Sequence, residues 1–485
     1  MRGPRGDLSQ RDAPVPASAS TRTGSAFRLR ASFLTPLARG GTRYEPDGIV
    51  EIDASGCIAW VGAAGEAGGR QGGAGEAATS SGPGAPADAP VVDLRPMLLL
   101  PGMVDLHAHL PQIPNAGLGA GLELLTWLDR YIFPMERGFD EAHAERLAPA
   151  AFRAFAAAGT TTAVIYAAVY EPSTEATFRA AEAHGLRAVI GKVMMDRLSY
   201  DDRLAPADVL ETSLRQSADL CSRWHGRDDG RLRYAFTPRF AVSCSADMLR
   251  ESARLAAETD AYWQTHLAED RGELAEVARL FPEATDYLDI YDRAGGLGAR
   301  TILAHAIHLS EREVAWLAET GAHVAHCPGS NLFLASGAMP LARYRDAGIS
   351  VGLGSDVAAG PELSIFAAMR AGAFTQSSLR ALEARPPDRG TTDAPIPTQM
   401  LTPLDWLRLG TLEGARALGI DDVTGSLEVG KEADFIAIDV ARTAPLPGVE
   451  AAEPDDLMSR LIFRPHPDMV RGAWVRGRLL EGPGV

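Results

Sequence analysis

PGMVDLHAH, residues 101–109, is the stretch that decides how the rest of the chain is interpreted. A Pro-Gly turn leads into a short apolar run, which is typical of a buried strand. Asp105, His107 and His109 are spaced by two within it, and this spacing puts their side chains on one face of an extended strand. A single buried histidine is usually a structural residue, but two imidazoles on one strand face are candidate metal ligands.

This run is the first of eight candidate strands. They are MVDLHAH, TAVIYAAV, RAVIGKVMM, RYAFTPRF, AYWQTHL, TILAHA, AHVAHCP and ISVGLGSD. Helical stretches such as STEATFRAAEAHG separate them, and this alternation predicts parallel strands. Eight strands close a barrel, so we expect an α/β protein with a (β/α)₈ TIM-like barrel over residues 98–420. A doubly wound open sheet has a similar pattern, and the polar residues at the strand ends must decide between the two.

Three more of the candidate strands end in a residue that can bind a metal. His266 lies in WQTHLAED, His305 in LAHAIH and Asp356 in GLGSD. The C-terminal strand ends of a barrel open onto one face, so these side chains are expected to meet those of His107 and His109. Imidazoles and a carboxylate suit zinc or another borderline divalent ion, with one position left for water. The alternative, that each residue merely caps its strand, has to hold independently at every strand end.

Glu269 follows His266 by three residues, just past the end of a candidate strand. At that position its carboxylate can reach a substrate bound over the metal rather than the metal itself, which makes it the candidate proton shuttle. A glutamate at the start of a helix is otherwise an ordinary solvated residue that the helix dipole favours. The neighbouring histidine is what favours the catalytic interpretation.

Both ends of the chain consist of short β-like runs separated by turn residues. Residues 26–97 and 421–485 are therefore expected to form one small β-sandwich domain. Residues 62–90 are almost pure Gly, Ala, Ser, Pro and Glu, which predicts a flexible surface insertion. Residues 1–25 lack apolar periodicity and are expected to be a disordered tail.

The composition disfavours several classes of protein. The chain has 485 residues and a formal net charge of −16, so it would repel a phosphate backbone, and we expect no nucleic-acid partner. Its 4 cysteines are scattered without a CxxC pair, which favours reduced thiols in the cytoplasm. There is no apolar leader and no run of eighteen apolar residues, so neither secretion nor membrane insertion is expected.

Taken in order, the motifs resemble those of the amidohydrolase superfamily, and within it those of the guanine deaminases, over most of the chain. The runs that carry the resemblance are HAHLPQIPNAG, LLTWLDRYIFPMER, GTTTAVIYA, GKVMMDR, TPRFAVSCS, QTHLAED, AHAIHLS, HCPGSN and GLGSDVAAG. The resemblance implies a metal-dependent hydrolase that converts guanine to xanthine and ammonia in purine catabolism or salvage. It also implies a homodimer.

The resemblance further implies a set of metal ligands. One Zn²⁺ per chain is expected to be bound by His107, His109, His266 and Asp356. His305 is expected near the metal-bound water and the substrate, where it serves catalysis and substrate binding.

The reaction that the resemblance implies assigns two catalytic carboxyl groups. Asp356 takes a proton from the bound water, hydroxide attacks C2 of guanine, Glu269 protonates N3, and ammonia leaves. Gln112 of HLPQ, and Arg239 and Phe240 of TPRF, match the family's purine-recognition positions. There an Arg and a backbone N–H address the carbonyl at C6, and an amide addresses the other ring edge. Such a site should reject adenine, because its buried donor would be left unpaired.

Several residues depart from the family's pattern. Ala306 stands where Gly is more frequent, Gly329 stands where Asn is common, and GPELS after Asp356 is also unusual. These departures concern substrate identity more than reaction type. Deaminases of other amino-substituted heterocycles, such as 8-oxoguanine, pterins, adenosine-like compounds or hydroxytriazines, therefore stay open as alternatives, although TPRF and HLPQ favour guanine.

Three further alternatives are weaker. A two-metal amide or imide hydrolase would use a carboxylated lysine, for which Lys192 is the candidate. A cytidine-type deaminase would carry H-x-E with PCxxC, but His143 and Glu145 lie in a helical pattern and no PCxxC follows. A non-catalytic barrel scaffold is disfavoured because every expected ligand is present. His308 and His326 match no ligand position and are interpreted as structural.

Overall fold

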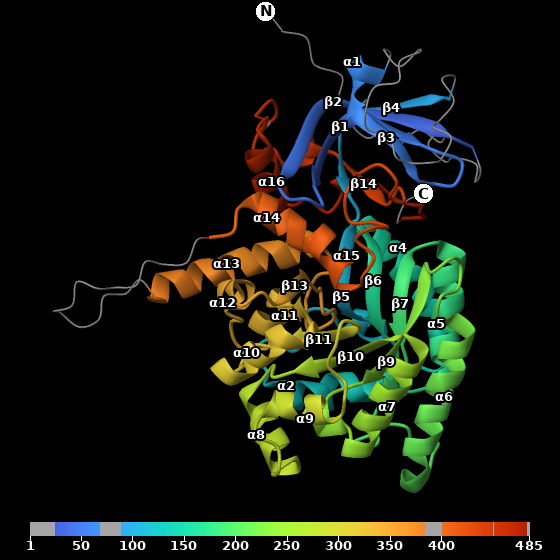
Figure 1. Cartoon of the computed structure of the whole chain (residues 1–485), viewed down its shortest axis with the longest axis vertical. Helices are drawn as coiled ribbons and strands as arrows, with labels where there is room; N and C mark the ends of the chain where they lie inside the picture. The colour runs from blue at the N-terminus through green and yellow to red at the C-terminus, as the bar shows by residue number, and fades with distance from the viewer. Residues whose placement is uncertain (1–24, 68–88, 384–399, 450, 483–485) are drawn as a thin grey trace, which may run out of the picture.

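The computed structural model describes residues 25–67, 89–383, 400–449 and 451–482. The expected tail lies outside the described residues except for Ser25, and so does the centre of the expected insertion, residues 68–88. The described chain forms a large barrel and a smaller sheet that lies above it in Figure 1. The first and last strands of the chain both belong to the smaller sheet.

The larger part is a (β/α)₈ barrel, which confirms the predicted fold class, and all eight candidate segments contain strands. Their bounds are β5 Met103–His109, β6 Thr160–Tyr166, β7 Arg187–Gly191 with its short continuation β8 Val193–Met194, β9 Leu232–Pro238, β10 Tyr262–Leu267, β11 Thr301–His305, β12 His323–His326 and β13 Ser350–Leu353. Neighbouring strands pair in parallel in this order. They read as apolar runs because both faces of each strand are covered, one by helices and one by the barrel interior.

Backbone hydrogen bonds join the first and last strands of the barrel. The amide of Asp356, just beyond β13, donates to the carbonyl oxygen of His107 at 2.7 Å. The amide of His109 donates in turn to the carbonyl oxygen of Val357 at 3.0 Å. These bonds close the barrel at the end where its strands finish. Residues at the ends of β5 and β13 therefore lie side by side, which an open sheet would not allow.

Asp105 departs from the strand face predicted for it. Its carboxylate accepts from the amide and the hydroxyl of Ser355, at 2.9 and 2.5 Å, and from the amide of His107 at 3.2 Å. The register of β5 against β6 shifts between Asp105 and Ala108, so simple alternation fails across this stretch. Asp105 consequently braces the turn after β13 instead of joining the two histidines.

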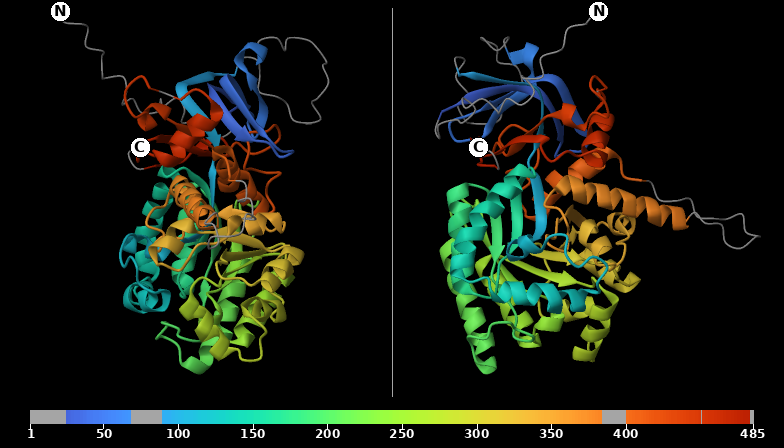
Figure 2. Two further views of the ribbon diagram at one scale, coloured as in Figure 1. Left: turned by 90° about the vertical axis from the view of Figure 1, so that its left-hand side faces the viewer. Right: turned by 180° about the vertical axis from the view of Figure 1, so that it is seen from behind.

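Helices cover the outside of the barrel, as Figure 2 shows from two further sides. The main ones are α4 Glu141–Ala157, α5 Glu171–His184, α6 Val209–Trp224, α7 Ala246–Thr259, α8 Arg271–Leu280, α9 Tyr287–Arg293, α10 Glu311–Thr320, α11 Pro328–Phe333, α12 Leu341–Asp346 and α13 Ile365–Glu383. Residues near the N-terminus of each of two of these helices determine where the helix begins. Ser310 and Glu313 form a capping box on α10, and Asp270 and Glu273 form one on α8.

A run of short helices connects β5 to α4 and borders the open end of the barrel. It consists of η3 Leu110–Asn115, α2 Leu124–Trp127, the π-helical η4 Leu128–Ile132 and α3 Phe133–Arg137. Leu124, Trp127 and Leu128 of this run line the same cavity as His109 at the end of β5. The connection thus supplies one wall of the site at the strand ends, as loops of a barrel commonly do.

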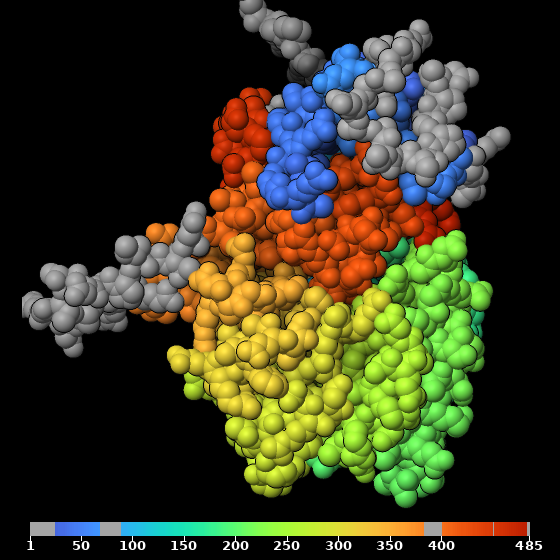
Figure 3. Space-filling view, in the orientation of Figure 1, coloured from blue at the N-terminus to red at the C-terminus, as the bar shows by residue number. Residues whose placement is uncertain are grey.

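The smaller sheet is assembled from both ends of the chain. Its strands are β1 Phe27–Pro36, β2 Thr42–Ile52, β3 Ile58–Ala63, β4 Val91–Pro101, β14 Phe435–Ile438, β15 Val470–Val475 and β16 Arg478–Leu479, in the order β16-β15-β14-β4-β1-β2-β3. Helix α1 Ala64–Ala67 packs against β2 and β3, and α14 Pro403–Arg408 contacts both β1 and α16 Pro454–Phe463, whereas α15 Gly414–Ala417 packs against β5 and β13 of the barrel. The sheet has an apolar core of its own, in which Phe435 and Trp474 stack with ring centroids 4.7 Å apart. Figure 3 shows the C-terminal segment in orange between the blue N-terminal strands and the barrel.

The two parts are joined tightly. Strand β4 runs into β5 through Gly102, where a Cβ atom would lie 1.9 Å from Thr161 Oγ1, so only glycine fits. Arg187, at the start of β7, forms a buried ion pair with Asp434 at 2.9 Å. Among the described residues, no helix combines the length and the apolar character needed to cross a membrane.

Candidate active site

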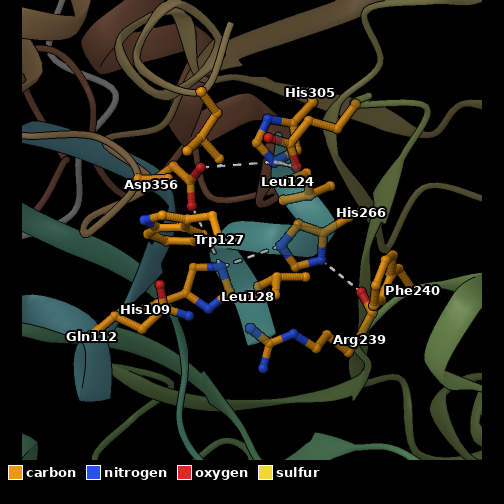
Figure 4. A pocket seen from close by; sticks show the side chains of 13 residues that line it. His109, Gln112, Leu124, Trp127, Leu128, Arg239, Phe240, His266, His305 and Asp356 are labelled. Atoms are coloured by element: carbon orange, nitrogen blue, oxygen red, sulfur yellow. Dashed lines mark hydrogen bonds and ion pairs between the residues drawn. The ribbon is translucent and has the colours of Figure 1, made fainter. Parts of the chain in front are cut away.

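Four of the predicted metal ligands meet at the C-terminal end of the barrel strands. The Nε2 atom of His109 lies 3.2 Å from that of His107 and 3.2 Å from that of His266. Asp356 Oδ1 lies 3.2 Å from Nε2 of His107 and 3.4 Å from Nε2 of His109. All four side chains are buried. Figure 4 shows those of His109, His266 and Asp356 at the cavity.

The contacts of His266 show which of its nitrogen atoms is free to bind a metal. Nδ1 of His266 lies 2.6 Å from the carbonyl oxygen of Arg239, which keeps the proton on Nδ1 and leaves a lone pair on Nε2. Burial lowers the pKa of His107, and it lowers those of His109 and His266 well below the usual value. Neutral imidazoles packed this closely favour a cation between them. Three nitrogen donors and one carboxylate fit a divalent metal ion.

Glu269 and His305 lie against this cluster. Glu269 Oε2 is 3.3 Å from His305 Nε2. On the other side of the ring, His305 Nδ1 is 2.9 Å from Asn331 Oδ1, so the proton sits on Nδ1 and Nε2 faces the cluster. The ligand atom of His305 also lies within 4.8 Å of those of His107 and His266. His305 thus lies beside the histidine cluster and lines the same cavity as Glu269.

The two catalytic carboxyl groups have pKa values that move in opposite directions. Burial and the charges of Asp356 and Glu273 raise the pKa of Glu269 well above its ordinary value. Burial also acts to raise the pKa of Asp356, but its charge and hydrogen-bond interactions with His107 outweigh burial and lower that pKa. Glu269 is therefore the better candidate for a proton donor, and Asp356 for a proton acceptor. A pair of this kind can supply an acid and a base in one site.

The backbone around the site is strained. Ala268, His305, Ala306 and Asp356 all have a positive φ, between 47° and 71°. Residues other than glycine rarely adopt a positive φ, and those that do are frequent at functional sites. The φ of 47° at Ala306 explains why glycine suits this position, where the sequence departs from the resembling family.

A cavity opens beside these groups, and its empty space, open solvent included, is about 360 Å³. Gln112, Arg239 and Phe240, the three residues predicted for purine recognition, all line it. Arg239 is buried, and its guanidinium group forms an ion pair with Glu136. The structure therefore brings the predicted recognition residues to the same cavity as Glu269.

Sequence reasoning missed Glu136 and the apolar wall of the cavity. The wall consists of Leu124, Trp127, Leu128, Leu334 and Ala359. Most of these residues, and Glu136, lie in the segment LLTWLDRYIFPMER, which carries the family resemblance but has no strand-end position to mark it. A glutamate in the otherwise apolar sequence IFPME was the one available signal that a charge in this helix is buried.

The other residues considered from the sequence lie elsewhere. Lys192 Nζ donates to Ser213 Oγ of α6 at 2.8 Å, so it points into the helix layer and away from the histidines. His143 is exposed near the start of α4 and bonds to its N-cap residue. His308 Nε2 lies 2.8 Å from the carbonyl oxygen of Ser336. None of these three residues lines the cavity of the described structure.

Known proteins resemble this chain in sequence. The amidohydrolase family matches residues 98–480. Guanine deaminase of Escherichia coli is 36% identical over 355 residues, which cover 73% of this chain and 75% of that protein. Human guanine deaminase is 34% identical over 340 residues, which cover 70% of this chain and 72% of that protein.

Solved structures agree with this comparison. A structure of guanine deaminase from C. acetobutylicum with guanine bound in its active site has a TM-score of 0.81 and 25% identity, and covers 94% of this chain and 100% of that one. A triazine hydrolase, at 21% identity and a TM-score of 0.73, shares the fold. The sequence match, the barrel and the cluster of ligands agree: the chain belongs to the amidohydrolase family, and within it to the guanine deaminases.

Proposed function

We propose that this protein catalyses the zinc-dependent hydrolytic deamination of guanine to xanthine and ammonia. One observation carries the proposal: a single cavity is lined by the ligand candidates His109 and His266, by the protonated Glu269, and by Arg239 and Gln112. The relatives named guanine deaminases, and the guanine complex of one of them, support guanine as the substrate.

The cavity residues bind and orient the base. Arg239 supplies hydrogen-bond donors for the carbonyl oxygen at C6, and Gln112 addresses another polar position on the ring. Trp127 and Leu128 line the cavity and offer an apolar surface for the ring. Adenine has an amino group where guanine has this carbonyl, so the buried donors of Arg239 would be left unpaired, and adenine should be a poor substrate.

His107, His109, His266 and Asp356 would hold a divalent ion here, and the ion would lower the pKa of a water toward neutrality and so make it a nucleophile at pH 7. The residues of the chain move the protons. Asp356, which is ionised, takes a proton from the attacking water. Glu269, which is protonated, delivers a proton to N3 of the ring as C2 is attacked.

Each turnover consumes one water molecule. Its oxygen becomes the carbonyl at C2 of xanthine, the C2–N bond breaks, and the amino group leaves as ammonia with one proton of the water, which Asp356 passes on. The other water proton is lost as the C2 hydroxyl becomes a carbonyl, and it replaces on Glu269 the proton that stays on N3. Asp356 and Glu269 return to their starting protonation states. His305, 3.8 Å from Asp356 Oδ2, lies where it can hold the reacting oxygen in place.

The metal and the assembly state are also proposals. Three imidazoles and a carboxylate, with a position left for water, support one Zn²⁺ per chain. The exposed apolar side chains of Phe374 and Leu382 on α13 support a homodimer in which that helix is covered. Cys57, Cys221, Cys244 and Cys327 form no disulfide, which supports a cytoplasmic location.

The test is a direct assay of the zinc-loaded protein with guanine. We expect equal amounts of xanthine and ammonia, and about one zinc per chain by metal analysis. Adenine, 8-oxoguanine, a pterin and a hydroxytriazine are assayed beside guanine. Preference for one of these would contradict the substrate assignment, and ammonia from none of them would contradict deamination itself.

A further inference from the structure

Glu136 contacts both polar recognition side chains of the cavity from behind. It lies in α3, and none of its side chain is exposed. Its Oε1 atom accepts a hydrogen bond from Gln112 Nε2 at 2.7 Å. Its Oε2 atom accepts one from Arg239 Nη1. One buried carboxylate therefore holds two side chains that come from distant parts of the chain, one after β5 and one after β9.

This contact fixes which end of the Gln112 amide faces the cavity. A carboxylate only accepts hydrogen bonds, so the amide nitrogen has to face Glu136. The opposite rotamer would put two oxygen atoms together at a buried position, which is unfavourable. The amide oxygen of Gln112 is thus left toward the substrate, as an acceptor.

The same contact determines how Arg239 acts. Its guanidinium group is buried, and a buried cation is stable only with a partner. Burial acts to lower the pKa of Arg239, and the charge of Glu136 outweighs burial and raises it. With one N–H group engaged by Glu136, other donors of the planar group remain for the substrate. The cavity then offers donors from Arg239 and an acceptor from Gln112.

We propose that Glu136 is a positioning residue that makes the pocket selective for an oxopurine, by holding Gln112 as an acceptor and Arg239 as a donor. This inference rests on the function proposed above. A carbonyl and a neighbouring ring N–H are the pattern that such a pair recognises, and guanine has both. A purine with an amino group at C6 has the reverse pattern, with a donor where guanine accepts and a ring nitrogen that lacks hydrogen.

The experiment compares guanine with 2,6-diaminopurine, which reverses this edge but keeps the 2-amino group that the reaction removes. In Glu136→Gln the new amide can donate to Gln112, so the Gln112 side chain is free to rotate. We expect kcat/KM for guanine to fall at least about tenfold, mainly through KM, and the ratio of guanine to 2,6-diaminopurine to fall about as much. Glu313→Gln is the matched control, because Glu313 is a buried carboxylate that caps α10 away from the cavity. In Glu313→Gln the ratio of kcat/KM for guanine to kcat/KM for 2,6-diaminopurine should stay as in the wild type.

Two outcomes would overturn the inference. Equal losses for both substrates in Glu136→Gln would mean that Glu136 only supports the fold of the segment. If the changes of the ratio in Glu136→Gln and Gln112→Ala simply add up in the double variant, Glu136 does not act through Gln112.

If Glu136→Gln does not fold, Gln112→Ala alone decides, since an unchanged ratio there would mean that the Gln112 amide does not discriminate between the two substrates. Failure of the proposed function is a separate result, because the wild-type protein would then release no ammonia from guanine.

Discussion

Nδ1 of His266 lies 2.6 Å from the backbone carbonyl oxygen of Arg239. The main chain of Arg239, whose side chain lines the cavity, therefore orients His266, one of the proposed metal ligands. The same carbonyl oxygen also accepts from the hydroxyl of Thr265 at 3.2 Å, which fixes the end of β10. Metal geometry depends on the backbone of Arg239 and substrate binding on its side chain, so the two functions can be separated by mutation.

Replacement of Arg239 by Ala is expected to weaken catalysis without loss of metal. The carbonyl oxygen that holds His266 remains, but the donors for the substrate are lost and Glu136 is left without its partner. We expect a lower kcat/KM for guanine, equivalent to a loss of at least about 1–3 kcal/mol of transition-state stabilisation. Steady-state kinetics and metal analysis measure the two effects. Arg250→Ala, at an exposed ion pair on α7, is the control and should behave as wild type. Loss of zinc from Arg239→Ala would show that the functions are not separate.

Replacement of Glu269 by Gln is expected to nearly abolish turnover while the metal content stays normal. The amide keeps the shape of the side chain but cannot deliver the proton that burial and the charge of Asp356 keep on Glu269. Loss of a general acid typically costs about 10²–10⁴ in kcat. Glu311→Gln, at an exposed position on α10, controls for the removal of a charge. Full activity in Glu269→Gln would remove this residue from the mechanism.

The strands and the ligands could be predicted because each has a local signal. A strand covered on both faces is a continuous apolar run, and a ligand at its end is a polar residue at a fixed place in that run, as His266 and His305 are. Asp105 shows where this reasoning fails. Its spacing by two predicts the face of His107, but the register shift within β5 turns it toward Ser355. Spacing cannot reveal a shift that depends on the neighbouring strand.

Glu136 and the apolar wall could not be predicted for a different reason. They lie in short helices between β5 and α4, and their positions depend on packing against the end of the barrel. Nothing in the sequence near Glu136 indicates that Gln112 and Arg239 are its partners, since these residues lie 24 and 103 positions away. Contacts of this kind are set by the closed fold and become visible only with it.

Removal of the metal is expected to lower thermal stability. Without an ion, the Nε2 atoms of His107, His109 and His266 lie close together in a buried site. An ion that binds only the folded state raises Tm as its concentration exceeds Kd, so a chelator should lower Tm and added zinc should restore it. Differential scanning fluorimetry measures the shift. His107→Ala should show little response to zinc, whereas His143→Ala, at an exposed position on α4, should respond as wild type. The same response in both variants would place the ion elsewhere.

His326 is expected to make the fold sensitive to acid. Its ring is buried, and neither ring nitrogen has a hydrogen-bond partner among the described residues. Burial and then the charge of His305 lower the pKa of His326 to about 3, whereas the unfolded chain has a histidine pKa of about 6.5. Between these two values the unfolded state binds a proton that the folded state does not. The contribution to stability is therefore complete above pH 6.5 and is lost as the pH falls toward 3, at about 1.4 kcal/mol per pH unit. His326→Leu should reduce the acid dependence by the share of this one residue, while the other buried histidines keep theirs. Urea unfolding of both proteins at pH 7 and pH 5 measures it, and equal losses of stability in the two proteins would show that other groups cause the acid sensitivity.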